Sequence, residues 1–208
     1  MFDPMAPAEQ TGTTAGRKGR GRRSIIRRFQ RSENGATAIE FGFVALPFFM
    51  LTWAIIETGL MFWTNQVLEE SLSQASRALL TGESRSRYSS STASVNAAAF
   101  RDDVCARAPM KLIDCTKLAI DVSTYSDFSG ASSGTASSNP LAGGNLDTSS
   151  FSYRQPDTGQ IVVVRAVLDY KLLLTSWASK DLANIGGAGS GRRGLVASMT
   201  FRAEPFVP

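Results

Sequence analysis

The longest apolar stretch of the chain is long enough to cross a lipid bilayer as a helix. Residues 41–56 carry no charge, and residues 36–63 contain only Glu40 and Glu57 as ionisable groups. A helix over residues 36–63 would rise about 42 Å, whereas the hydrocarbon core of a bilayer is about 30 Å thick. The pattern therefore predicts one transmembrane helix, which Pro47 is expected to kink.

Beyond this stretch the helical pattern continues with only one apolar face. The apolar positions recur at steps of four, three and four: Leu68, Leu72, Ala75 and Leu79. Gly82 is expected to end the helix as its C-cap. Residues 36–82 are therefore predicted to form one long helix, half in lipid and half outside, whose outer half needs a partner in the rest of the chain.

Residues 83–208 show the shorter periods of a small α+β region. Alternating or continuous apolar runs predict three strands, and a short helix is expected before the first of them. The helix falls at 92–106 and the strands at 118–122, 161–170 and 195–201. The Ser- and Gly-rich residues 123–160 are expected to form a long loop or a partly disordered insertion. The predicted fold is thus α+β, with the long N-terminal helix packed on an antiparallel sheet of about three strands.

Charge separates the first 35 residues from the remainder. Residues 1–35 contain eight basic and three acidic residues, a net charge of +5, and the remainder sums to −1. This tail is rich in Gly and has few apolar residues, so it is expected to be mostly disordered. A basic arm for nucleic acid usually joins a soluble domain, whereas this one ends at an apolar span. Basic residues beside a span remain cytoplasmic, which predicts a cytoplasmic N-terminus and an exported C-terminal region.

A secretory signal peptide is the alternative to an anchor. Signal peptides have an apolar region of about 7 to 15 residues that ends at a small-residue cleavage site. This span is longer, its end at residues 59–63 is bulky, and helical sequence follows it directly. The pattern favours an anchor.

Nothing in the sequence points to catalysis. The absence of His excludes Ser-His and Cys-His arrangements and His-based metal sites. Asp102 and Asp103 are adjacent, so on a helix they point in different directions. The Gly-rich residues 186–194 lack the Lys-Ser/Thr ending of a phosphate-binding loop and are interpreted as a turn. No catalytic residue, metal site or cofactor is predicted, and an enzyme is not expected.

The two cysteines, Cys105 and Cys115, lie in the predicted exported region with nine residues between them. Their spacing matches no zinc site. In an oxidising compartment a disulfide would stabilise the fold by about 2 to 3 kcal/mol. The alternative is a pair of free thiols packed in a small core.

The residues at the entrance of the span resemble a type IV prepilin leader, in which a basic tail ends at Gly35 and Glu40 follows five residues later. Two stretches of the sequence are similar to TadE-like pseudopilins of Tad (Flp) pilus systems: G-A-T-A-I-E-F-G-F-V-A-L-P-F-F, and A-S-M-T-F-R-A-E-P-F near the end. The resemblance implies cleavage by a prepilin peptidase between Gly35 and Ala36. In filament-forming relatives the carboxylate corresponding to Glu40 is balanced by the N-terminal amine of a neighbouring subunit. Many prepilins have Phe, rather than Ala36, at the first mature position.

The resemblance implies a structural role in Tad pilus assembly, in the bacterial inner membrane with the C-terminal domain in the periplasm. The expected partners are the prepilin peptidase, other Tad pilins or pseudopilins, inner-membrane assembly proteins and the lipid bilayer, with no nucleic acid. For Glu57 two environments stay open: the exported interface, or an intramembrane contact with another helix. The alternative function is an unprocessed single-pass anchor for an exported domain that binds another envelope partner.

Overall fold

The computed structural model describes residues 33–137, 139–173, 182–187 and 189–205. The chain divides into two compact units, residues 1–50 and 51–208, and the second is called the folded domain below. The expected disorder of residues 1–32 lies outside the described residues. Residues 33–35, expected to end the leader, already belong to a helix.

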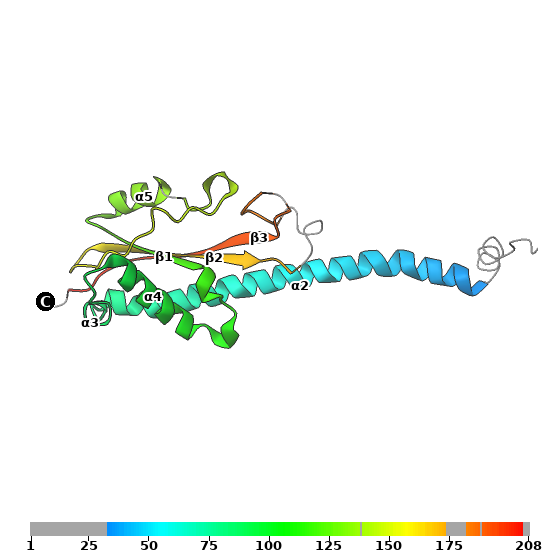
Figure 1. The fold of residues 1–208 in the computed structure, drawn as a ribbon, viewed down its shortest axis with the longest axis horizontal. Helices are drawn as coiled ribbons and strands as arrows, with labels where there is room; N and C mark the ends of the chain where they lie inside the picture. Colours follow the sequence, from blue (N-terminus) through cyan, green and yellow to red (C-terminus); the bar gives the residue numbers. More distant parts are fainter. Residues whose placement is uncertain (1–32, 138, 174–181, 188, 206–208) are drawn as a thin grey trace, which may run out of the picture. The chain divides into compact units, whose positions relative to one another are not determined.

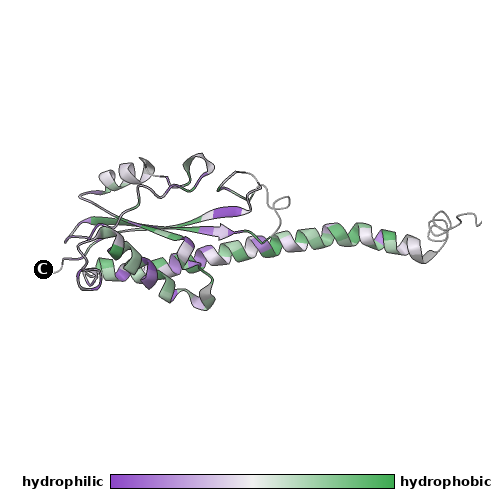
Figure 2. Cartoon of the chain, viewed as in Figure 1, coloured by the Kyte–Doolittle hydropathy of each residue, from purple (hydrophilic) through white to green (hydrophobic). Residues whose placement is uncertain are grey.

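Helix α2 spans Glu33–Leu80 and contains Pro47 in its interior. Among the described residues, it is the one helix that is long and apolar enough to cross a membrane. Figure 2 shows that its first half is mainly hydrophobic, whereas polar positions appear in its second half. The helix ends where predicted, because Gly82 follows two residues later with a φ of 80°, a conformation that glycine adopts without steric cost.

The sheet of the folded domain has three antiparallel strands: β1 (Leu118–Tyr125), β2 (Ile161–Lys171) and β3 (Arg192–Arg202). Their order is β1-β2-β3, so β2 is central and the other two form the edges. The predicted long helix and three-stranded antiparallel sheet are therefore confirmed. Strand β3 begins three residues before the predicted start at Leu195, because Arg192 still pairs with Lys171 of β2.

The two faces of the sheet are covered by different elements. On the inner face, alternate residues of β2 pack with the apolar face of α2 and with Phe100 and Val104 of helix α4 (Ala93–Arg107). On the outer face, Ile161 and Val163 pack with Ala131 of helix α5 (Phe128–Ser137). Figure 1 shows α4 and α5 on either side of the strands. The domain thus consists of a central sheet between two layers.

The Ser- and Gly-rich segment 123–160 is more ordered than the sequence predicts. It contains α5, and its residue Tyr153 forms a parallel bridge with Val122 of β1. Helix α5 begins after Asp127, whose carboxylate accepts a hydrogen bond from the Gly130 N–H at 2.7 Å and so caps the helix. The prediction of one long loop was wrong for these parts, since capping and packing on the sheet outweigh the low helix propensity of Ser and Gly.

Short elements connect the rest of the chain. They are α3 (Ser84–Arg87) after α2, the 3₁₀ turns η1 (Pro109–Lys111) and η2 (Cys115–Lys117) between α4 and β1, and η3 (Ala142–Gly144) after α5. The predicted helix at 92–106 corresponds to α4, displaced by one residue.

Candidate functional site

The first part of α2 presents large apolar side chains outward. Phe43 is 81% exposed and Phe41 is 69% exposed, whereas Leu68 and Leu72 further along the helix are completely buried. Twelve large apolar residues of this part are exposed: Ile39, Phe41, Phe43, Val44, Leu46, Phe48, Phe49, Met50, Leu51, Trp53, Ile55 and Ile56. Complete burial of such a side chain is worth about 1.5 to 3 kcal/mol, and these residues are 41–81% exposed, so their removal from water is worth roughly 10 to 20 kcal/mol in total. This surface therefore needs an apolar surrounding, which a bilayer provides.

The predicted processing residues lie at the beginning of this helix. Gly35 is in the first turn of α2, so the bond to Ala36 lies within helical backbone. Glu40 is exposed at the start of the apolar surface. On a helix the five-residue spacing corresponds to about 7.5 Å along the axis. Gly35 and Glu40 are therefore about one and a half turns apart.

The buried face of α2 begins at Glu57. Its members follow one another at steps of three or four and are all buried: Glu57, Met61, Thr64, Leu68, Leu72, Ala75 and Leu79. The predicted apolar face of the outer half is therefore confirmed. Three further buried residues, Thr64, Met61 and Glu57, continue this face toward the N-terminus. Glu57 is the first buried member of this face among the described residues.

Glu57 lies against the start of the β2–β3 connection. Its side chain is 1% exposed, and both carboxylate oxygens lie within hydrogen-bond distance of the Leu173 N–H, at 2.9 and 3.0 Å. Nearby, burial raises the pKa of Tyr170, and the negative charge of Glu57 raises it further. Of the two environments left open by the sequence, the structure gives Glu57 a partner in its own chain at the end of the folded domain.

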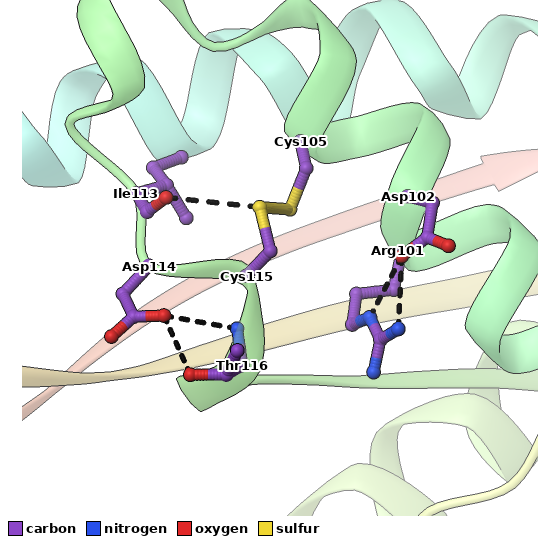
Figure 3. The surroundings of a disulfide bond; sticks show 7 residues. All are labelled: Arg101, Asp102, Cys105, Ile113, Asp114, Cys115 and Thr116. Carbon is purple, nitrogen blue, oxygen red and sulfur yellow. Dashed lines mark hydrogen bonds and ion pairs between the residues drawn. A yellow bond between two sulfur atoms is a disulfide. The ribbon is translucent and has the colours of Figure 1, made fainter.

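A disulfide joins Cys105 of α4 to Cys115 of η2, which confirms the predicted bridge (Figure 3). The Cα atoms of the two residues are 6.1 Å apart. Next to the bridge, the Asp114 carboxylate accepts hydrogen bonds from the hydroxyl and the backbone N–H of Thr116, at 2.6 and 3.0 Å. These two bonds lower the pKa of Asp114, the hydroxyl having the larger effect. The bridge and this capped turn fix the path from α4 into β1.

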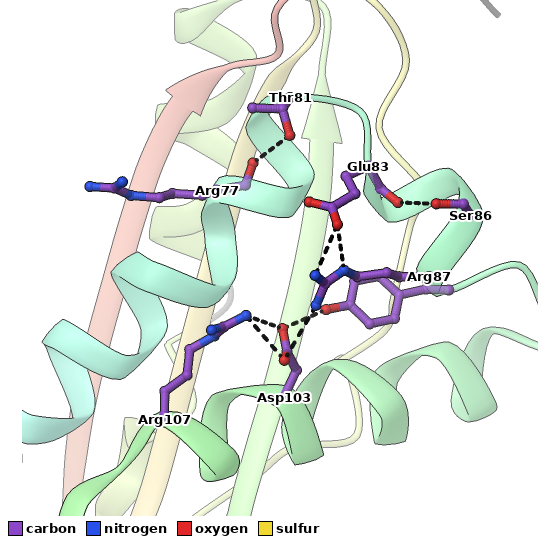
Figure 4. A network of polar contacts seen from close by, with 8 residues as sticks. Arg77, Thr81, Glu83, Ser86, Arg87, Asp103 and Arg107 are labelled. Atoms are coloured by element: carbon purple, nitrogen blue, oxygen red, sulfur yellow. Dashed lines mark hydrogen bonds and ion pairs between the residues drawn. The ribbon is translucent and has the colours of Figure 1, made fainter.

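A polar network connects α4 to the segment that follows α2 (Figure 4). The Asp103 carboxylate accepts hydrogen bonds from the Tyr88 hydroxyl at 3.0 Å and from Arg107 at 3.0 and 3.1 Å, and Arg87 lies 3.7 Å away. The adjacent Asp102 instead pairs with Arg101 on the surface. The two neighbouring aspartates therefore have separate partners, and Asp103 has a positioning role in the fold.

Aromatic rings fill the core beside this network. Tyr88 packs edge-to-face against Phe100 and against Tyr153, with ring centroids 5.6 and 5.8 Å apart. Burial raises the pKa of Tyr88, and its hydrogen bond to Asp103 adds to this effect. Burial also raises the pKa of Tyr153, with a further contribution from Tyr88. Both hydroxyls are thus held in the neutral form.

A buried ion pair on the outer face of the sheet was not foreseen from the sequence. Asp121 of β1 lies directly opposite Arg165 of β2, and their charged groups are 2.8 Å apart. The side chains are 1% and 8% exposed. A charged residue in the middle of each apolar strand was visible in the sequence, but only the register shows that the two meet.

Comparison with known proteins gives a match to a protein family. Residues 35–77 match the model of the family described as TadE-like protein. No curated protein and no solved structure matches the chain. The matched residues begin at Gly35 and include both the exposed apolar part of α2 and most of its buried face. Over residues 35–77 the chain is therefore similar to the TadE-like family, which confirms the resemblance found in its sequence.

Proposed function

We propose that this chain is a TadE-like minor pseudopilin with a structural role in Tad (Flp) pilus assembly. The observation that carries the proposal is the match of residues 35–77 to the TadE-like family, over a helix that first exposes an apolar surface and then packs into a folded domain. No enzymatic activity is part of this role. Its partners would be other Tad pilins or pseudopilins, inner-membrane assembly proteins and the bilayer.

The two glutamates of α2 limit where the bilayer can lie. Glu57 is buried against the folded domain, so the hydrocarbon region ends before it. The seventeen helical steps from Glu40 to Glu57 rise about 26 Å, slightly less than the roughly 30 Å of a typical hydrocarbon core. A small mismatch of this kind is accommodated by local thinning of the bilayer or by snorkelling of the boundary side chains. Glu40 would therefore lie at one boundary of the membrane.

Charge and cysteine chemistry support one orientation. The basic residues of segment 1–35 precede the apolar surface, and such residues remain cytoplasmic. The folded domain contains a disulfide, which forms and persists in oxidising compartments such as the bacterial periplasm. In this proposal the chain crosses the inner membrane once, with its N-terminus cytoplasmic and its folded domain periplasmic.

The proposal includes cleavage between Gly35 and Ala36 by a prepilin peptidase. Gly35 supplies a small residue at the scissile bond, and cleavage would leave a free amine at Ala36, one turn before Glu40. A lone charge within the bilayer costs on the order of 2 to 3 kcal/mol or more. The amine of a neighbouring subunit would offset the charge of Glu40, and this pairing would favour assembly of the processed protein.

Expression of the full chain with and without a prepilin peptidase tests this function. Intact mass and N-terminal sequencing should show a product that begins at Ala36 only when the peptidase is present. Gly35→Ala should block this product, whereas Gly42→Ala should not, because nothing lies within 4 Å of a Cβ added at Gly42. An N-terminus other than Ala36, or equal processing of both variants, would refute cleavage at Gly35. A chain left uncleaved in the presence of the peptidase would favour the alternative function as an unprocessed anchor.

A further inference from the structure

The outer edge of β1 lines a slot of about 450 Å³, which we call the edge slot. Its floor is residues 118–120 of β1, which has β2 on its other side. One wall is α4, through the small side chains of Ala93, Ala97 and Ala98, and the other is segment 148–153. The edge slot therefore has the edge of a strand at its base and a layer of the domain on each side.

The next part of the same edge already accepts a strand from the chain itself. The Val122 N–H donates to the carbonyl of Ser152 at 2.8 Å, and the Arg154 N–H donates to the carbonyl of Val122 at 2.9 Å. Backbone groups of alternate residues in a strand point to the same edge. The N–H and C=O groups of Leu118 and Ile120 therefore point into the edge slot, where no other strand of the described chain pairs with them.

The walls of the edge slot suit a strand between them. Side chains of an added strand would alternate, one set toward the alanines of α4 and the other toward segment 148–153. The second wall is held in place by the buried ion pair. The Ser152 N–H donates to the Asp121 carboxylate at 3.0 Å, and the Phe151 ring lies 5.5 Å from the Arg165 guanidinium carbon.

We propose that the edge slot binds an extended segment of another protein, which adds to β1 as a fourth strand. Its backbone would pair with Leu118 and Ile120, whose side chains pack in the core and which line the edge slot. Because α4 and segment 148–153 flank this edge, the β1 edge of a second copy, flanked in the same way, is a poor partner. A projecting tail or loop with small or apolar side chains toward α4 fits. This inference depends only on the folded domain and not on processing at Gly35.

The test uses the full chain in lipid nanodiscs and a displayed library of random peptides as the probe. Selected peptides should slow hydrogen exchange at the Ile120 amide. Ala98→Trp, which fills the edge slot, should weaken their binding at least tenfold. Ala99→Trp, at the next position of α4 and outside the lining of the slot, is the matched control and should bind as the unaltered chain does. Should Ala98→Trp lower the melting temperature, Ser94→Trp at the exposed mouth of the slot replaces it.

Three results would overturn the proposal. They are a library that yields no binder, binders that leave exchange at Ile120 unchanged, and binders unaffected by the slot-filling variant. A photo-reactive residue at position 94, in cells that assemble the pilus, tests the nature of the partner. An adduct with a different protein, lost in Ala98→Trp but kept in Ala99→Trp, is expected. An adduct between two copies of this chain would refute the assignment to another protein.

Discussion

Removal of the Asp121 carboxylate should destabilise the folded domain more than removal of any exposed charge. Asp121 accepts hydrogen bonds from Arg165 Nε and Nη2 at 3.2 and 2.8 Å, and from the Ser152 N–H at 3.0 Å. In Asp121→Ala the buried guanidinium loses this carboxylate, and the Ser152 N–H loses its acceptor. Breaking a buried ion pair by removing one partner costs about 3 to 5 kcal/mol, and we expect a loss within this range.

The measurement is urea unfolding of the full chain in detergent micelles. Near-ultraviolet circular dichroism of the core aromatic residues should follow the unfolding of the domain rather than the micelle-bound part of α2. The control is Asp102→Ala, because Asp102 is 65% exposed and its pair with Arg101 is on the surface. Exposed pairs contribute less than about 1 kcal/mol, so this variant should be close to the unaltered chain.

A second variant separates the charge from the packing. When both members of a buried pair are replaced by apolar residues, stability is often unchanged or increased. Asp121→Ala combined with Arg165→Met should therefore recover most of the loss. Equal stability of Asp121→Ala and Asp102→Ala, or a double variant no more stable than Asp121→Ala, would refute the reasoning.

Three other predictions concern the core of the folded domain. Replacing both Cys105 and Cys115 with Ser should lower the free energy of unfolding by about 2 to 3 kcal/mol, and the shift on a non-reducing gel should disappear; a reductant that leaves the original chain equally stable would contradict this. Leu72→Ala should lower the free energy of unfolding by about 2 to 5 kcal/mol in the same urea assay, because Leu72 is completely buried. A loss below about 1 kcal/mol would contradict the burial of Leu72 in the core. The free energy of unfolding should fall as the pH rises above about 10. Tyrosines of the unfolded chain ionise there, while the raised pKa values of Tyr88 and Tyr153 keep these two side chains neutral in the folded domain. A free energy that is flat across this range, or an ultraviolet titration in which all tyrosines ionise together while the domain is folded, would refute this prediction.

Elements with a clear period could be predicted from the sequence. The outer half of α2 was recognised because leucines at helical spacing form one apolar face. Strand β2 was recognised because it is a run of apolar residues, alternate members of which share one face. The disulfide was predicted because the membrane span placed both cysteines in an exported, oxidising compartment. These signals are local, and each required only a few neighbouring residues.

Other features depend on contacts between distant residues. Helix α5 lies in a Ser- and Gly-rich segment, and its stability depends on the Asp127 cap and on packing of Ala131 against β2. The environment of Glu57 depends on where the β2–β3 connection passes, 116 residues later in the chain. The edge slot is also invisible in the sequence, because the path of segment 148–153 across the sheet creates one of its walls.

The position of Arg165 also restricts how the sheet can form. Side chains of β2 alternate between the two faces, and the neighbouring residues Val164 and Ala166 face the leucines of α2. A slip of one residue in the pairing would exchange the faces and place the guanidinium in this apolar layer, away from Asp121. An uncompensated buried charge is strongly unfavourable, so the pair makes the neighbouring registers of β1 and β2 costly during folding. Of the charged residues in these strands, Arg165 and Asp121 thus specify the register of the sheet. Without this pair, the valines would not distinguish one register from the next, and the turns alone would set it.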